Sequence, residues 1–237
     1  MNRLDSAALA RRAATKGLEE ATPEGRRTIN RLDPVTLEGH YVRLEPLTTA
    51  HVPRLLAVAL GARDTFGLTT VPSGETDMVS YVATLLRDHA DGRALPFATI
   101  DRARGQVVGA TRFLDVQFWS WPADSPYQRG AEAPDVVEIG GTWLAPSAQR
   151  TGINTEAKLL MLTHAFETWR VHRVSLKTDA RNARSRAAIL RLGARFDGIL
   201  RAVRVAADHT IRDDANYSIL DGEWPTVKER LVSRLHQ

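Results

Sequence analysis

The sequence predicts a mixed α/β domain in which helices flank a largely antiparallel central sheet. Its 237 residues are 43% apolar and 25% charged, which is the composition of a globular protein with a full hydrophobic core. Segments with the two-residue period of strands outnumber those with helical spacing, and the two kinds do not alternate strictly as they would in a doubly wound parallel sheet. Two of the strand-like segments flank a short charged turn, which is typical of a hairpin.

The chain divides into an extension and one domain. Residues 1–28 are rich in Ala, Arg, Glu and Thr, and Pro23 and Gly25 interrupt a helix that would begin near Ser6. We therefore expect a partly flexible N-terminal extension over 1–28 and a folded domain over 29–237.

The elements of that domain follow from the spacing of apolar residues. Strand-like alternation lies at 36–46, 95–101, 106–116, 136–146, 171–179, 194–205 and 210–220. Helical spacing lies at 50–60, 75–87, 155–170, 182–193 and 224–235, where Gly193 is a natural stop for the fourth helix. Residues 117–134 hold three prolines and two tryptophans without a period, so they should form a long loop.

Composition excludes several classes of protein. Without cysteine the chain has no disulfide, thiolate zinc site or cysteine nucleophile, and the histidines lack metal-ligand spacing, so no metal is expected. No run approaches 18 apolar residues and the N-terminus lacks the pattern of a secretory signal, so we expect a cytoplasmic protein without a membrane segment. The net charge of +4 comes from scattered basic residues, which favours a solvated surface over a nucleic-acid interface.

The stretch QRTGINTEAKLLML, residues 149–162, places a glycine turn directly before a helix with an apolar stripe. Glycine lets a ligand approach the main chain, and a helix N-terminus carries unpaired N–H groups and partial positive charge. These features predict a site for a pyrophosphate. The alternative is that Gly152 is only a turn residue and Thr155 an N-cap. Lys158 interrupts the stripe, and its amine should reach solvent or support the phosphates.

This stretch resembles the signature of the GNAT superfamily of acyl-CoA-dependent N-acetyltransferases, in particular its RimL-type members. The signature is Gln/Arg-x-x-Gly-x-Gly/Ala, and its fixed places fall on Gln149, Gly152 and Asn154, where Asn replaces Gly or Ala but tolerates left-handed geometry. Further similar stretches are YVRLEPL, VEIGGTWLAP, NARSRAAILRLGA, IRDDANYSIL and EWPTVKERL, so the resemblance covers residues 34–235. It implies a GNAT fold with the sheet split around an acetyl-CoA site.

The resemblance also implies roles for individual residues. Glu138 would be the base that accepts the amine proton, with a structural carboxylate paired to an arginine as the alternative. Ser185 would protonate the departing thiolate, because Ile189 stands where many members carry a tyrosine. Asn182 would bond the pantetheine arm or only cap its helix. The remaining expected cofactor contacts are Trp143, Leu144 and Ala145 through their backbone, and Gln149, Arg150, Thr151, Gly152, Ile153, Asn154 and Thr155 around the helix terminus.

The function implied is direct transfer of an acetyl group from acetyl-CoA to a primary amine, most simply a protein N-terminus or a small amine. The alternative is a regulatory module that binds CoA without turnover. The sequence leaves the acceptor open and does not decide whether the subunits pair as a homodimer.

Overall fold

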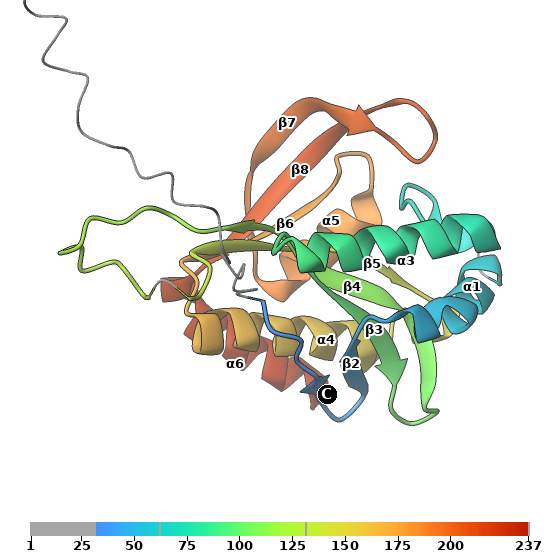
Figure 1. The fold of residues 1–237 in the computed structure, drawn as a ribbon, viewed down its shortest axis with the longest axis horizontal. Coiled ribbons are helices and arrows are strands. Elements are labelled where there is room, and N and C mark those ends of the chain that lie inside the picture. The colour runs from blue at the N-terminus through green and yellow to red at the C-terminus, as the bar shows by residue number, and fades with distance from the viewer. Residues whose placement is uncertain (1–31, 62, 131, 237) are drawn as a thin grey trace, which may run out of the picture.

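One eight-stranded sheet forms the centre of the molecule (Figure 1). The computed structural model describes residues 32–61, 63–130 and 132–236, so the extension expected over 1–28 lies outside the described residues. The strand order is β1-β2-β3-β4-β5-β6-β8-β7, and every neighbouring pair is antiparallel except β5 and β6. The strands are β1 (Leu37–Glu38), β2 (Val42–Pro46), β3 (Leu95–Asp101), β4 (Gln106–Gln117), β5 (Val136–Leu144), β6 (Arg173–Asp179), β7 (Arg195–Val205) and β8 (Ile211–Leu220).

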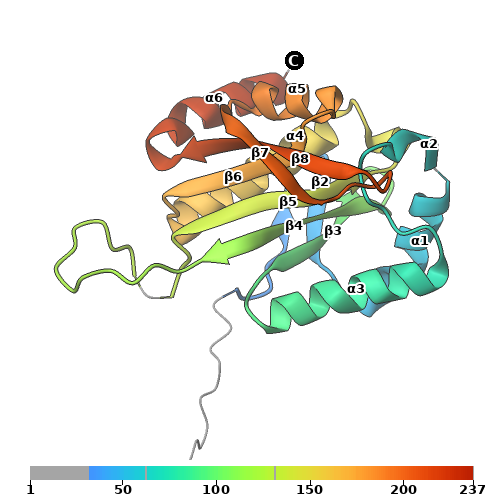
Figure 2. The same ribbon diagram turned by 90° about the horizontal axis from the view of Figure 1, so that it is seen from above.

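Helices cover both faces of this sheet. Figures 1 and 2 show α4 and α6 on one face and α1 and α3 on the other. The helices are α1 (Val52–Leu60), α2 (Arg63–Phe66), α3 (Glu75–Ala90), α4 (Gly152–Thr163), α5 (Ala183–Leu192) and α6 (Trp224–Leu235), with a π-helical turn at His164–Trp169. Over the described part of the chain, no helix is long and apolar enough to cross a membrane.

Two hydrophobic cores correspond to these two layers. Met161 of α4 packs with Phe113 and Val137 of the sheet, whereas Met78 of α3 packs with Ile100. Side chains of a strand alternate between its two faces, so β3, β4 and β5 each contribute to both cores. The mixed, mostly antiparallel sheet with flanking helices confirms the predicted fold class.

The sheet opens between β5 and β6. The two strands pair only over Val136–Glu138 and Arg173–Ser175. Beyond this point β5 continues to Leu144 paired with β4, and β6 continues to Asp179 paired with β8. The parallel strands therefore diverge, as expected for a sheet split around a ligand site.

The first predicted strand is interrupted. Residues 36–46 form two strands joined by a turn, because the carboxylate of Glu156 on α4 accepts the backbone N–H groups of His40, Tyr41 and Val42 at 2.7, 2.6 and 2.8 Å. A Cβ atom on Gly39 would lie 2.3 Å from the Glu156 carboxyl carbon, so only glycine fits this turn. Glu156 is thus a buried anchor between β2 and α4.

The loop between β4 and β5 extends away from the sheet (Figure 1) and is held by Asp135. The Asp135 carboxylate accepts the Trp119 backbone N–H and the Trp121 indole N–H, both at 2.6 Å. The Trp119 ring lies parallel to the His172 ring with centroids 5.8 Å apart. Trp119 and Trp121 therefore pack against His172 at the start of β6.

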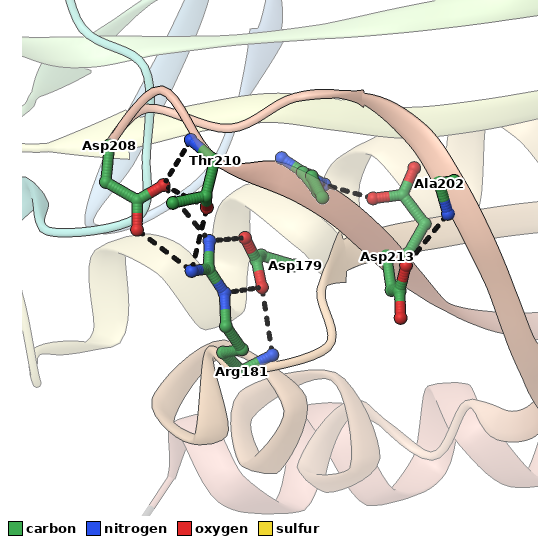
Figure 3. A network of polar contacts seen from close by, with 8 residues as sticks. Asp179, Arg181, Ala202, Asp208, Thr210 and Asp213 are labelled. Carbon is green, nitrogen blue, oxygen red and sulfur yellow. Dashed lines mark hydrogen bonds and ion pairs between the residues drawn. The ribbon is translucent and has the colours of Figure 1, made fainter.

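The β7–β8 hairpin is fastened at its tip by Arg181, which follows β6. Figure 3 shows the Arg181 guanidinium between Asp179 and Asp208, with ion-pair distances of 2.8 and 2.9 Å, and it also donates to Thr210 at 3.1 Å. These contacts hold the turn between β7 and β8 next to the start of α5. Gly193 ends α5 with a φ of 102°, which confirms the predicted left-handed cap.

Candidate active site

The N-terminus of α4 lies at the open end of the split. The helix begins at Gly152, and the Thr151 hydroxyl caps it by accepting the Ile153 N–H at 3.2 Å. The expectation of a start near Thr155 is wrong, because Thr151 takes the cap and Thr155 lies within the helix. The positive φ of this turn belongs to Arg150, at 61°, and not to Asn154.

Gly152 packs closely against Tyr41. A Cβ atom there would lie 3.0 to 3.3 Å from ring atoms of Tyr41, which packs under the turn. Contacts this short are tighter than ordinary van der Waals contacts, so the glycine allows Tyr41 to support the turn from below. The remaining N–H groups of the first helical turn have no intrahelical partner by the geometry of the α-helix.

Two arginines flank this helix terminus. Arg184, in the first turn of α5, donates to the Gln149 side chain at 3.3 Å and to the Thr65 carbonyl oxygen at 3.0 Å. Arg150 is exposed beside it. Neither guanidinium forms an ion pair with any residue that the structure describes, which fits a bound phosphate. Sequence reasoning missed Arg184. Its position two residues after Asn182, in the helix that follows β6, was a usable signal.

Gln149 ties this turn to β5. Its amide donates to the Leu144 carbonyl oxygen at 2.9 Å. The Ala145 N–H donates to Val108 of β4 at 2.7 Å, so Ala145 offers no free donor to the split, contrary to the prediction. Backbone groups of a strand point alternately to its two neighbours, so the Leu144 N–H faces the split. The N–H of Trp143 points toward β4 by the same alternation, and its ring is buried against Phe66.

Glu138 lies where β5 and β6 separate. It pairs across the strands with Ser175, and its buried carboxylate contacts the Lys177 ammonium at 2.8 Å. Lys177 also contacts Asp115 at 2.7 Å. Burial, the largest effect, raises the pKa of Glu138, and the Lys177 charge opposes that rise. Burial alone would also raise the pKa of Asp115, but Lys177 brings it below its ordinary value. Glu138 is ion-paired, as the alternative of a structural carboxylate expects, but its partner is Lys177 and not an arginine.

A cavity of about 190 Å³ opens beside Glu138. Charged and polar side chains of both signs line it, among them Asp115, Glu138, Arg173, Ser175, Lys177 and Asp197. The Nε atom of Arg173 is buried and has no hydrogen-bond partner among the residues described. Because a buried donor without a partner is costly, Arg173 is notable as a residue of the cavity lining with an unsatisfied hydrogen-bonding group.

The other predicted residues lie at the far end of β6. The Asn182 side chain accepts the Ser185 N–H at 3.0 Å, so it caps α5. Ser185 is half-buried in the first turn of that helix. Glu138 is level with Ser175, and four residues of strand, about 13 Å, separate that point from the end of β6. The structure therefore does not bring Glu138 and Ser185 together directly.

Tyr217 is buried, and its hydroxyl accepts from Arg186 Nε at 3.0 Å. Lys158 does not reach solvent or the helix terminus. Its side chain is buried beneath the sheet, where its amine contacts two threonines.

Comparison with known proteins gives consistent matches. Residues 42–195 match the family model described as the acetyltransferase (GNAT) domain. A GCN5-related N-acetyltransferase from Brucella melitensis is 30% identical, with 86% of each chain covered and a TM-score of 0.71. Mycobacterium smegmatis RimJ in complex with CoA-disulfide is 23% identical, covering 81% of this chain and 88% of RimJ with a TM-score of 0.67.

A third structure, ribosomal-protein-S5-alanine acetyltransferase from Vibrio fischeri, is 15% identical, covering 80% of this chain and 98% of the other with a TM-score of 0.60. At this identity, and at that of RimJ, the likeness shows the shared fold. A search of curated proteins gives no match.

Proposed function

This chain belongs to the GNAT family and is an N-acetyltransferase that uses acetyl-CoA, and from that premise we propose that it acetylates a primary amine that enters the cavity beside Glu138. The observation that carries the proposal is a buried carboxylate at the point where β5 and β6 separate. The most suitable acceptor is an α-amine that carries a neighbouring carbonyl or carboxylate oxygen, as a protein N-terminus does.

Acetyl-CoA supplies the acetyl group as a thioester with a phosphorylated tail. The groups of this chain suited to that tail are the first N–H groups of α4, with Arg150 and Arg184 beside them. The turn Gln149–Thr155 would hold the pyrophosphate, and the Leu144 N–H would face the thioester. Asn182 already caps α5 through its oxygen, so only its amide nitrogen is left for the pantetheine arm.

Glu138 is suited to accept the amine proton. In the reaction the amine nitrogen bonds to the acetyl carbon, the carbon–sulfur bond breaks, and the amine loses one proton while the thiolate gains one. A carboxylate whose pKa is raised by burial is a better base near neutral pH than an ordinary one. Lys177 keeps the carboxylate in place and limits that rise. Ser185 remains our candidate for protonating the thiolate, through water along the split.

The lining of the cavity favours an amine with an adjacent oxygen. Asp115, Glu138 and Asp197 supply negative charge for the amine, and Arg173 supplies an unpaired donor. On β6, Arg173 and Ser175 are two residues apart, so they lie on one face about 7 Å apart. The α-amine and carbonyl oxygen of one amino-acid residue are close enough to bridge Glu138 and Arg173. A polyamine has no oxygen for Arg173.

The test is thiol release from acetyl-CoA over a panel of amines. The panel contains a short peptide with a free α-amine, the same peptide with a blocked N-terminus, spermidine and an aminoglycoside. We expect turnover with the free peptide, and a decrease in kcat of about 100-fold or more in Glu138→Gln. Ser185→Ala should lower kcat by a smaller factor.

Arg173→Leu separates the acceptor classes. It should raise KM for the peptide and leave turnover of spermidine unchanged. If spermidine or the aminoglycoside is the better substrate of the wild type, the proposed acceptor class is wrong. If acetyl-CoA binds and no amine releases thiol, the chain is a CoA-binding module and the assignment of Glu138 fails with it.

A further inference from the structure

Lys158 is a buried lysine that the proposed chemistry does not use. It is 5% exposed, although it lies only six residues, about 9 Å of helix, from Gly152 at the start of α4. Its amine lies 2.6 Å from the Thr142 hydroxyl and 3.2 Å from the Thr111 hydroxyl, and the two hydroxyls lie 2.8 Å apart. Lysine is rarely buried this completely without a charged partner.

The two threonines lie on neighbouring strands at a β-bulge, Thr111 on β4 and Thr142 on β5. Ala110 pairs with Trp143 and Arg112 pairs with Gly140, so the single residue Thr111 opposes both Gly141 and Thr142. Gly141 has a φ of 57°, the left-handed conformation that a bulge often requires. The Lys158 amine therefore connects the two strands across their irregular step.

The bulge lies in the part of β5 that no longer pairs with β6. Pairing with β6 ends at Glu138, and residues 140–144 have β4 as their only neighbour in the sheet among the residues described. A bulge bends its strand and redirects the groups that follow it. The position of the Leu144 N–H along the split therefore depends on the geometry of this bulge.

We propose that Lys158 is a positioning residue for acetyl transfer, which fixes the β5 bulge to α4 and so aims the backbone donor of Leu144 into the split. One helix then supports both parts of the site, because its N-terminus faces the phosphates and its side chain holds the strand beside the thioester. This inference rests on the proposed function, since it assumes that the Leu144 edge of β5 contacts the acetyl group.

The contacts explain why an amine is needed at this position. The Lys158 amine donates to the hydroxyls of Thr142 and Thr111, and the two hydroxyls lie within hydrogen-bond distance of each other, so the three groups form a closed triangle. Burial lowers the pKa of Lys158 to about 7. A methionine would fill the same space but leave the bulge connected only by the contact between the two hydroxyls.

The test compares Lys158→Met with a second variant and a control. Thr142→Val removes the partner hydroxyl while keeping the lysine. Met161→Leu removes the sulfur that accepts from the Thr111 hydroxyl at 3.8 Å but keeps all three groups of the triangle. The measurements are kcat and KM with the best amine of the panel, the Kd of CoA, and hydrogen exchange at the backbone amides of 140–144.

We expect kcat to fall by about 10- to 100-fold in both Lys158→Met and Thr142→Val, because a displacement near 1 Å at a reacting group costs this much. The Kd of CoA should stay within about twofold of the wild-type value, since the helix terminus is unchanged. Exchange at 140–144 should become faster in both variants, and Met161→Leu should behave as the wild type. A purely structural lysine would change stability without this selective loss of kcat.

The inference is wrong if Thr142→Val, or a folded Lys158→Met, keeps the wild-type kcat and the wild-type exchange at 140–144. If the wild type itself acetylates no amine, the proposed function fails instead, and the exchange data alone then decide whether Lys158 holds the bulge. If Lys158→Met does not fold, Thr142→Val carries the test.

Discussion

Replacing Lys158 by methionine should change how the stability of the fold depends on pH. The folded protein lowers the pKa of this lysine from 10.5 to about 7, and the cause is burial. Among the described residues no carboxylate forms an ion pair with it. Between these two pKa values the unfolded chain holds a proton that the folded chain has released, so the free energy of unfolding of the wild type rises with pH across this window.

The size of the effect follows from the shift. Each pKa unit corresponds to about 1.36 kcal/mol. At pH 7 the buried lysine destabilises the fold by about 4 kcal/mol, and near pH 10 by about 1 kcal/mol, so this group alone contributes a rise of about 3 kcal/mol. Methionine has nearly the same length and no charge, and the two threonine hydroxyls keep each other as partners at 2.8 Å.

Urea unfolding of the wild type, Lys158→Met and Met161→Leu at four pH values from 7 to about 10 measures this contribution. Lys158→Met should be the more stable protein at pH 7, and its advantage over the wild type should shrink by about 3 kcal/mol toward pH 10. Met161→Leu should follow the wild type in parallel. A difference between Lys158→Met and the wild type that stays constant with pH would show that this lysine does not titrate in the window and would refute the reasoning.

Three further predictions concern the helix terminus and the hairpin. Arg184→Ala should raise the Kd of acetyl-CoA, measured by calorimetry, by about 10-fold with little change in kcat, because losing a charge-assisted hydrogen bond to phosphate costs about 1.5 kcal/mol. An unchanged Kd would remove Arg184 from the site. Gly152→Ala should weaken binding of acetyl-CoA, because the added Cβ would lie 3.0 Å from the Tyr41 ring. Adding Tyr41→Leu should restore part of the lost affinity. If it restores none, the ligand and not Tyr41 requires the glycine. Arg181→Ala should speed hydrogen exchange at 208–210, since the guanidinium holds Asp208 and Thr210. Arg201→Ala, which replaces an exposed arginine on β7, should leave this exchange unchanged. Equal exchange at 208–210 in the two variants would contradict the contacts of Figure 3.

Local patterns were sufficient for most of the fold. The hairpin of β3 and β4, the strand that carries Glu138 and the glycine cap of α5 each depend on residues close together in the sequence, and each was predicted. The short helix α2 was not predicted, because its four residues are too few for a helical period.

Contacts between distant residues account for the errors. Lys158 in an apolar stripe suggests a side chain that reaches solvent, and its partners, 47 and 16 residues away, are not visible in the sequence. The break between β1 and β2 depends on Glu156, more than 110 residues further along the chain. Thr151 and Thr155 are both suitable caps, and the sequence alone did not show that Thr151 is the one used.

The same limit applies to the site. Glu138 could be chosen from its strand, but its partner Lys177 and the unpaired Arg173 come from β6, which only the folded sheet brings alongside. Ala145 was expected to offer a donor, and the position of Val108 on β4 shows that this donor is already used.

Hydrogen exchange with and without acetyl-CoA tests the central claim most directly, because it reports where the cofactor binds without requiring knowledge of the acceptor. Our account predicts slower exchange at the Leu144 amide and at 150–155 when acetyl-CoA is present, with no change along the exposed strand β7. Protection that falls elsewhere, or none at saturating acetyl-CoA, would contradict the assignment of the split between β5 and β6 as the cofactor site.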